Sequence, residues 1–251
     1  PPKKMPNQTP LILALKAKKS NVEIHKHAAF QIVFTDDYPF STTLESQEYP
    51  DIFGFVIKPQ VAHACVCNQG NVVILNIEPY SFLGKLIEEQ LGNKNAVVFY
   101  AKSEFQHFLG LQEGAFSIDR LLDLKSQSSS TKPLDTRIEN AIAFIHEHFK
   151  AENISTQDLA NHVFLSPSRL ATLFKQQMGS SISKYLLWTR LRNAIFQILT
   201  TKDKNLTTIA LESGFYDSSQ MTKYMYQLFG ISPSKLKQKS DLIQFLAIET
   251  A

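Results

Sequence analysis

The C-terminal half of the chain repeats itself, and this repeat constrains the fold more than any other feature of the 251 residues. Leu159-Ala160 matches Ile209-Ala210 at an offset of 50 residues, whereas positions from Leu170 onward match those from Met221 onward at an offset of 51. One extra residue in the second turn explains the change of offset. Each copy is predicted to form a short helix, a tight turn and a longer helix, which is the helix-turn-helix arrangement.

The ends of the predicted helices carry suitable capping residues. In the first copy Ser155 or Thr156 can cap the short helix, and Pro167 stands where the longer helix begins. Gly214 occupies the turn of the second copy, where the backbone often needs a positive φ. The first copy has Phe164 at the matching position, so the two turns differ in residue type.

The longer helix of each copy has an inward face and a polar face. The predicted inward residues are Leu170, Leu173, Phe174 and Gln177 in the first copy, and Met221, Tyr224, Met225 and Leu228 in the second. Small polar and basic residues stand opposite them. One such helix fits an ordinary solvated surface as well as it fits a DNA major groove, but two copies at matched spacing favour DNA.

The segment between the two copies is predicted to be a single helix over residues 183–199. At ~1.5 Å per residue it would be a rod of roughly 25 Å, which could place two recognition helices in successive major grooves about 34 Å apart. Residues 166–204 contain seven Lys and Arg against one acidic residue, although the net charge of the whole chain is only +3. This local excess favours a polyanion as partner, and no lipid-facing apolar stripe accompanies it.

The motifs of this half follow one another in a known order and spacing. They are Asp158-Leu159-Ala160, Leu165-Ser166-Pro167-Ser168, Leu173-Phe174-Lys175, Gly179, Tyr185-Leu186, Arg190-Leu191, Ala194, Leu199, Ile209-Ala210, Gly214-Phe215, Phe229-Gly230 and Ser232-Pro233-Ser234. Over residues 138–237 they resemble the DNA-binding domain of the AraC/XylS family of bacterial transcription regulators. The chain departs from the family pattern at Phe164, Lys223 and Met225, where Gly, Arg and Phe are common.

The resemblance implies two helix-turn-helix units that bind promoter DNA and recruit or displace RNA polymerase, with activation favoured over repression. Carried over position by position, the base-facing residues are Ser168, Arg169, Ala171, Thr172, Ser218, Ser219, Thr222 and Lys223. Lys175 and Arg190 are expected on the phosphates.

The first half is predicted to be rich in short strands. Apolar or β-branched runs at 27–34, 53–57, 63–67 and 72–77 are separated by turn residues, and helices are predicted at 80–91 and 116–124. This pattern indicates a small antiparallel β-barrel or sandwich. The family resemblance favours a cupin-like barrel that senses a ligand and can dimerise. The whole chain is therefore expected to be an α+β multidomain protein, divided into a cupin-like domain (1–125), a Ser-rich linker (126–134), the DNA-binding domain (135–240) and a C-terminal tail (241–251).

Three histidines and a glutamine of the first half resemble the polar residues of the cupin motifs. His25 and His27 would share one side of a strand, and Gln31 and His63 would lie nearby. We interpret these four as contacts for a small-molecule effector or as buried barrel residues. We expect no metal and no cofactor, because Gln31 stands where metal-binding cupins carry Glu. Cys65 and Cys67 are interpreted as small core residues rather than a redox pair.

Three functions remain open at this stage. The first is a ligand-responsive DNA-binding regulator, and the second is a regulator whose β-domain only dimerises. The third is a metal-dependent cupin enzyme, which is disfavoured by the fused DNA-binding half and by the absence of a phosphate loop, a Gly-x-Ser-x-Gly motif and paired carboxylates. The expected partners are double-stranded promoter DNA, RNA polymerase, an effector and a second copy of the chain. No apolar run approaches the ~18 residues of a membrane span, no signal-peptide pattern opens the chain, and its two cysteines fit a reducing bacterial cytoplasm.

Overall fold

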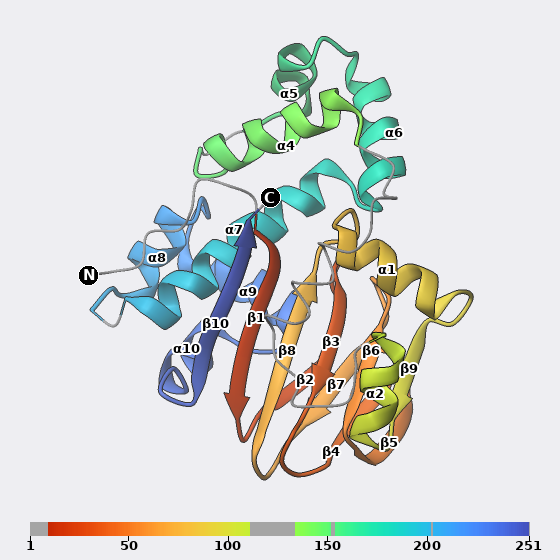
Figure 1. Ribbon diagram of the computed structural model, residues 1–251. Helices are drawn as coiled ribbons and strands as arrows, with labels where there is room; N and C mark the ends of the chain where they lie inside the picture. Colours follow the sequence, from red (N-terminus) through yellow and green to blue (C-terminus); the bar gives the residue numbers. More distant parts are fainter. Residues whose placement is uncertain (1–9, 111–133, 152–153, 202, 251) are drawn as a thin grey trace. The chain divides into compact units, whose positions relative to one another are not determined.

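A computed structural model describes residues 10–110, 134–151, 154–201 and 203–250, excluding the side chains of residues 10, 11 and 244–250 (Figure 1). The described residues form two compact units, one within residues 12–110 and the other mainly within residues 134–250. The first unit is built from strands with two short helices, and the second is helical. This division matches the predicted change from a strand-rich half to a helical half.

The first unit consists of two antiparallel sheets. Its strands have the orders β1-β8-β3-β6-β9 and β2-β7-β4-β5. The elements are β1 (Pro10–Lys18), β2 (Asn21–His25), β3 (Phe30–Phe34), β4 (Phe40–Leu44), β5 (Gln47–Ile52), β6 (Gly54–Ile57), β7 (His63–Val66), β8 (Asn71–Ile77), α1 (Phe82–Leu91), β9 (Ala96–Phe99) and α2 (Lys102–Phe108).

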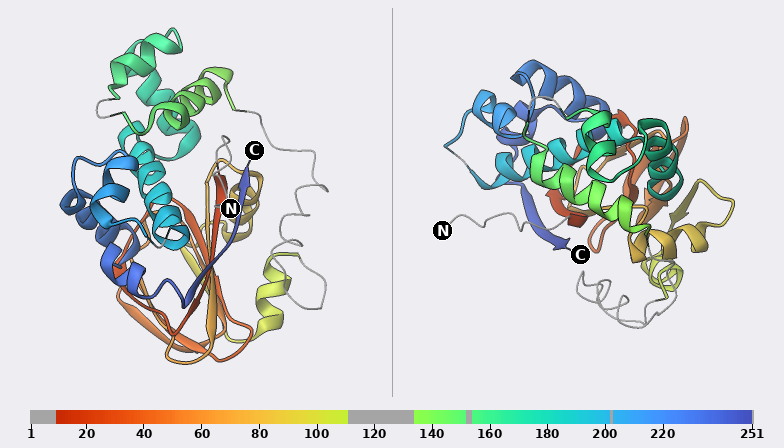
Figure 2. Two further views of the ribbon diagram at one scale, coloured as in Figure 1. Left: turned by 90° about the vertical axis from the view of Figure 1, so that its left-hand side faces the viewer. Right: turned by 90° about the horizontal axis from the view of Figure 1, so that it is seen from above.

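The two sheets face one another across an apolar and aromatic interior. The Phe55 ring of β6 lies between them, with its centroid 6.1 Å from that of Phe40 on β4 and 6.3 Å from that of His63 on β7. Helix α2 covers the outer side of the sheet (Figure 2). Its Phe105 ring stacks on that of Phe34 of β3 at a centroid distance of 5.0 Å. All five residues of β3 are buried, because this strand is covered on both faces.

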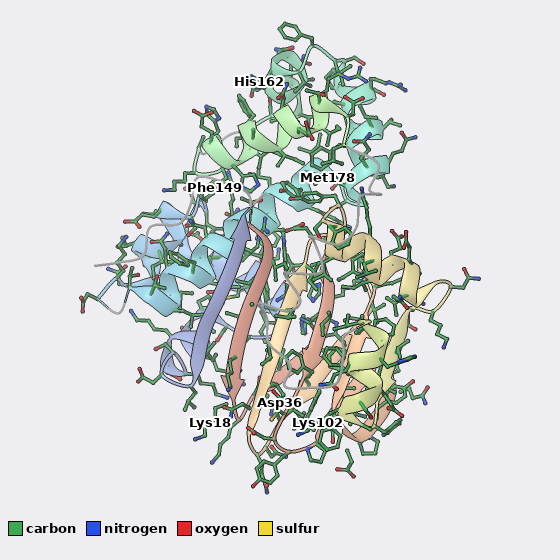
Figure 3. All side chains as sticks on the ribbon, in the orientation of Figure 1. Lys18, Asp36, Lys102, Phe149, His162 and Met178 are labelled. Carbon is green, nitrogen blue, oxygen red and sulfur yellow. The ribbon has the colours of Figure 1, made fainter. Side chains whose placement is uncertain are left out.

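Helix α2 is also held to the sheet by a side chain at its start. The Lys102 ammonium donates to the backbone carbonyl of Asp36, and both residues are labelled in Figure 3. Cys65 and Cys67 are buried, unpaired thiols, so their interpretation as core residues is confirmed. Desolvation raises the pKa of both thiols, which keeps them protonated.

Four predicted strands and one predicted helix of this unit are confirmed as β3, β6, β7, β8 and α1. The strands β1, β2, β4, β5 and β9 and the helix α2 were not predicted. The strand predicted to begin at His27 begins instead at Phe30, so His27 lies in the connection between β2 and β3. The predicted helix at 116–124 and the linker up to residue 133 lie outside the described residues.

The second unit has the predicted double helix-turn-helix organisation (Figure 1). Its elements are α4 (Thr136–His148), α5 (Thr156–His162), α6 (Pro167–Met178), α7 (Ile182–Thr200), α8 (Leu206–Glu212), α9 (Ser218–Phe229), α10 (Pro233–Gln238) and β10 (Ile243–Thr250). The strand β10 lies within residues 241–251, which were expected to form a C-terminal tail. None of the described helices combines the length and apolarity needed to cross a bilayer.

The caps of the helices repeat along with the helices themselves. The N-cap side chains of α5 and α8 are Ser155 and Asn205, 50 residues apart, and those of α6 and α9 are Ser166 and Asp217, 51 residues apart. Each of these side chains accepts a hydrogen bond from a backbone N–H in the first turn. Helices α6 and α9 both end on a glycine in the left-handed conformation, Gly179 or Gly230.

Helix α7 joins the two copies and forms much of their core. It is 19 residues long and buries Trp188, whose ring stacks on Phe229 at the end of α9 with a centroid distance of 5.0 Å. About one turn earlier in α7, the Tyr185 ring meets that of Phe174 of α6 at a centroid distance of 5.6 Å. The two helix-turn-helix copies are thus packed on one continuous helix, which contacts α6, α8, α9 and α10.

Candidate functional site

The first recognition helix, α6, is held by its apolar face. Leu170, Phe174 and Met178 are buried, at exposures of 0%, 0% and 2%. The predicted base-facing residues Ser168, Arg169, Ala171 and Thr172 are all exposed, and so is Lys175. The Thr172 hydroxyl donates to the Ser168 carbonyl at 3.0 Å, which leaves its methyl group and the lone pairs of its oxygen for a partner. Of the predicted inward residues of α6, Leu170 and Phe174 are buried whereas Leu173 and Gln177 are only half-buried, and the predicted outward residues are exposed.

The second recognition helix, α9, presents a matching surface. Met221, Met225 and Phe229 are buried, while Ser219, Thr222 and Lys223 are exposed and Ser218 is half-buried. The Lys223 ammonium lies 5.9 Å from the centroid of the Tyr224 ring, close enough for a cation–π contact that leaves the ammonium at the surface. Position for position, Lys223 corresponds to Thr172 and Ser219 to Ser168, so α9 carries the more basic surface.

The turns between the paired helices have the same backbone path in both copies. The N–H of Leu165 donates to the Ala160 carbonyl at 2.9 Å, and the N–H of Phe215 donates to the Ala210 carbonyl at 3.0 Å. The preceding residue has a positive φ in each copy, 56° at Phe164 and 85° at Gly214. Phe164 therefore adopts the left-handed conformation that the glycine was predicted to supply, and its ring is 94% exposed.

Arg190 on α7 donates hydrogen bonds to two backbone carbonyls at and beyond the end of α4, a contact that was not predicted. Its Nε donates to the carbonyl of Phe149 and its Nη2 to that of Ala151, both at 2.8 Å. Phe149, labelled in Figure 3, is the C-cap of α4, so Arg190 satisfies carbonyls left open by the end of that helix. The guanidinium is directed into the unit by these bonds, in contrast to the phosphate contact expected for it.

The spacing of the two recognition helices is set by α7. Its 19 residues give a rod of about 28 Å at about 1.5 Å per residue, slightly longer than the predicted segment. A buried hydrogen-bond network joins it to the second copy, because the Ser213 hydroxyl donates to Asn193 Oδ1 at 3.1 Å and the Gln197 amide donates to the same atom at 2.8 Å. These bonds fix the second copy rigidly on α7.

The polar residues predicted for the first unit lie in its interior, but not in the predicted way. His25 ends β2 and stands directly opposite His63 of β7, whereas His27 belongs to the connection after β2. The expectation that His25 and His27 share one strand is wrong. The three rings nevertheless gather, with centroids 4.0 to 5.8 Å apart.

Gln31 has a partner of its own. Its amide donates to Asn76 Oδ1 of β8 at 3.1 Å, and both side chains are buried. Gln31 shares a face of β3 with Val33, which stands opposite Phe55, so Gln31 points toward the same interior as the Phe55 ring.

The helical unit and the overall fold are similar to those of known proteins. A helix-turn-helix domain family model matches residues 159–239. The arabinose operon regulatory protein of Escherichia coli K12 is 32% identical over 105 residues, which are 42% of this chain and 36% of that protein. The probable transcriptional regulator LumQ of Photobacterium leiognathi is 26% identical over 200 residues, 72% of this chain and 77% of LumQ.

Among solved structures, ToxT of Vibrio cholerae has the same fold in both units. Its TM-score is 0.56 at 13% sequence identity, with 91% of this chain and 98% of that one covered. The fold and its surface define a double helix-turn-helix protein with an N-terminal β-domain. Its helical unit is similar in sequence to that of the arabinose operon regulatory protein, in agreement with the resemblance to the AraC/XylS family. The chain spans about a third of the length of the first curated relatives, 36% for the arabinose regulator.

Proposed function

We propose that the chain is a sequence-specific DNA-binding transcription regulator. The observation that carries the proposal is the pair α6 and α9, which are capped alike, packed on one helix, and expose small polar and basic side chains opposite their buried faces. On a single helix, an exposed face of this composition fits an ordinary solvated surface as well as a DNA-binding surface. Two copies joined by a helix of about 28 Å could reach successive major grooves, which lie about 34 Å apart on one side of the double helix.

The chemistry of the exposed side chains supports groove binding in different ways for the two helices. Arg169 and Lys223 can donate to the acceptor edge of guanine, and the Ala171 and Thr172 methyl groups suit the methyl group of thymine. Ser168, Ser218, Ser219 and Thr222 can bond either bases or phosphates. Lys175, at the far end of α6 from the cap, suits a phosphate, whereas Arg190 is occupied by the carbonyls of α4.

The remaining parts of the proposal concern regulation. We assign residues 1–125 to the sensing domain, 126–134 to the linker, 135–240 to the DNA-binding domain and 241–251 to the tail. The regulator would activate transcription with RNA polymerase in the cytoplasm when a small-molecule effector binds the β-domain. The polar residues His25, His27, Gln31 and His63 inside that domain support an effector site, because an apolar interior alone would bind without orienting its ligand.

DNA binding is tested by selecting sites from a random-sequence duplex library with the full chain, followed by fluorescence anisotropy on the selected and scrambled duplexes. At physiological salt the selected duplex should bind more tightly than the scrambled duplex by a factor on the order of 10³ or more, as is typical of specific sites. Log Kd should rise with log salt by roughly 0.9 per phosphate contact. Equal affinity for both duplexes, or binding that salt leaves unchanged, would contradict the proposal.

Effector sensing is tested by thermal shift over a library of small metabolites. A compound that stabilises the full chain should lose its effect in His27→Ala, while the DNA affinity of the ligand-free variant stays the same. Full retention of the shift in His27→Ala would place the effector elsewhere. If no compound shifts the melting temperature and the chain is dimeric in sedimentation, the β-domain serves as a dimerisation module instead.

A further inference from the structure

The histidine cluster of the first unit brings together three nitrogen ligands from separate segments. His25, His27 and His63 are 8%, 1% and 1% exposed, so water is almost excluded from all three. One nitrogen of each ring lies within 4.8 Å of the corresponding nitrogen of the others. Among the described residues, no other group of His, Cys, Asp and Glu side chains converges in this way.

The backbone determines which nitrogen of each ring carries hydrogen. Nδ1 of His25 lies 2.8 Å from the Glu23 carbonyl, that of His27 lies 3.1 Å from the Ala29 carbonyl, and that of His63 lies 2.9 Å from the Val61 carbonyl. A carbonyl oxygen only accepts, so Nδ1 must be the donor in each ring. A neutral imidazole with hydrogen on Nδ1 has a lone pair on Nε2, and this applies to all three histidines.

Burial also keeps the rings neutral. Desolvation lowers the pKa of His25 to about 4 and that of His63 to about 3, and it lowers the pKa of His27 well below its usual value.

A cluster of three acceptor nitrogens needs a positive group or a donor to be stable. Nε2 of His63 is buried and has no hydrogen-bond partner among the described residues. The neighbouring Phe55 ring, whose centroid lies 6.3 Å from that of His63, has no N–H or O–H group that could donate to it. Since a buried acceptor without a donor costs free energy, a cation at the centre of the three rings would remove this cost.

We propose that His25, His27 and His63 bind one divalent transition-metal ion, with Zn²⁺ as the best match, through their Nε2 atoms. Three imidazoles and one open position are a known arrangement for Zn²⁺. The backbone carbonyls that accept from Nδ1 of the three rings fix the ring orientations, as the hydrogen-bond partners of metal-binding histidines commonly do. A tetrahedral ion with Zn–N distances of about 2.0–2.1 Å requires nitrogens roughly 3.3 Å apart, so the rings would close slightly around it.

The charge of the site follows from its ligands. All three imidazoles are neutral and no carboxylate belongs to the cluster, so a bound Zn²⁺ would keep both of its charges. Cys65 lies two residues further along β7 but is not part of the cluster, and its thiol is kept protonated by burial. The open fourth position would therefore hold water or an external ligand.

The test uses the full chain without an affinity tag, stripped with EDTA and dialysed. Zn²⁺ is titrated in by calorimetry, and Co²⁺ is added to a second sample as a spectroscopic substitute. The expected result is one ion per chain, a raised melting temperature, and a visible Co²⁺ spectrum of the tetrahedral type. X-ray absorption of the Zn²⁺ form should show nitrogen ligands without sulfur, and this measurement requires no variant.

The variants His25→Gln, His27→Gln and His63→Gln should each weaken Zn²⁺ binding at least 100-fold. His107→Gln, which changes an exposed histidine of the same unit, and Cys65→Ser should bind as the unchanged chain does. Circular dichroism checks that each variant is folded. The proposal is overturned if the unchanged chain binds no Zn²⁺ at micromolar concentration, if sulfur appears among the ligands, or if folded histidine variants bind normally. DNA binding is measured separately, so its outcome does not affect this test.

Discussion

Phe164 and Gly214 have the same left-handed backbone in the two matched turns, yet only the glycine is enclosed. A Cβ atom added at Gly214 would lie 2.4 Å from the Phe149 carbonyl oxygen and 2.8 Å from Arg190 Nε. The Phe164 side chain is instead 94% exposed and meets no such obstacle. The backbone requirement is shared by both turns, and the requirement for a small residue comes from packing around the second turn alone.

This difference predicts that substitution at Gly214 is costly and substitution at Phe164 is nearly neutral. Gly214→Ala should destabilise the helical unit by about 2–5 kcal/mol, because a left-handed alanine costs roughly 1–2 kcal/mol and overpacking adds about 1–3 kcal/mol. Phe164→Gly should change stability by less than about 1 kcal/mol, since relief of backbone strain is offset by the greater freedom of the unfolded chain. Urea unfolding followed by the fluorescence of Trp188, the only tryptophan, measures both. Similar losses in the two variants would contradict the argument.

A second prediction concerns Arg190, which bridges α7 and the end of α4. Arg190→Ala should cost about 1.5–3 kcal/mol of stability, because two carbonyls lose a charged donor. Arg190→Lys should recover only part of this, since an ammonium lacks the planar pair of donors. The salt dependence of DNA binding should stay the same in folded Arg190→Ala, whereas Lys175→Ala should lower the slope by roughly 0.9. A lowered salt slope in folded Arg190→Ala would instead show that Arg190 contacts a phosphate, as the sequence predicted.

The helical unit could be predicted largely from the sequence because its information is local. Caps at Ser166 and Asp217, a helix period of 3.6 and the repeat itself all lie within a few turns of the residues they determine. What the sequence did not disclose was the long-range contact of Arg190, whose carbonyl partners are about 40 residues away. No local pattern marks a basic residue on a helix as a partner of a distant helix end.

The β-domain was predicted less completely because strand pairing is not local. The strand β5, with the sequence Gln47-Glu48-Tyr49-Pro50-Asp51-Ile52, is mostly exposed and has no apolar alternation, and it is ordered by pairing with β4. His25 and His27 were both predicted as candidate site residues, but for the wrong reason, because they were expected to lie on the same side of one strand. They meet because the chain turns after His25 and because β7 places His63 opposite it.

A third prediction concerns pH and His146, which is half-buried in the helical unit beside Tyr185. Its Nε2 lies 3.0 Å from the Tyr185 hydroxyl, and desolvation together with the positive charge of Arg192 lowers its pKa to about 3. The unfolded chain binds the proton near pH 6.5 and the folded chain does not, so stability is full above that value and falls as the pH is lowered toward 3.

The measurement compares unfolding of the unchanged chain with that of His146→Gln at pH 7 and pH 5. The glutamine can keep a hydrogen bond to Tyr185 but cannot take up a proton. Between the two pH values the unchanged chain should lose about 1–2 kcal/mol more than the variant, at ~1.4 kcal/mol per pH unit below the unfolded pKa. Substituting the exposed His107 by Gln serves as the control. Identical pH dependence in the unchanged chain and His146→Gln would mean that the folded unit protonates this ring without penalty.

The last prediction separates base recognition from phosphate contact at Lys223. Because this side chain is exposed, Lys223→Ala should change stability by no more than about 0.5 kcal/mol. If the ammonium bonds a guanine edge, the variant should lose ~1–3 kcal/mol of binding on the selected duplex and tolerate substitution at one base pair. If it contacts only phosphate, affinity should fall equally on selected and scrambled duplexes, and the salt slope should drop by roughly one contact.

The matched control is Phe174→Ala, which removes a fully buried ring from the opposite face of the other recognition helix. It should cost about 3–5 kcal/mol of stability and weaken DNA binding only through unfolding, so that binding recovers when the temperature is lowered. Anisotropy titrations on both duplexes, with Trp188 unfolding curves for each variant, distinguish these outcomes. If folded Lys223→Ala binds DNA with unchanged affinity and unchanged salt dependence, Lys223 does not contact DNA. Base recognition by α9 would then depend on its serine and threonine side chains.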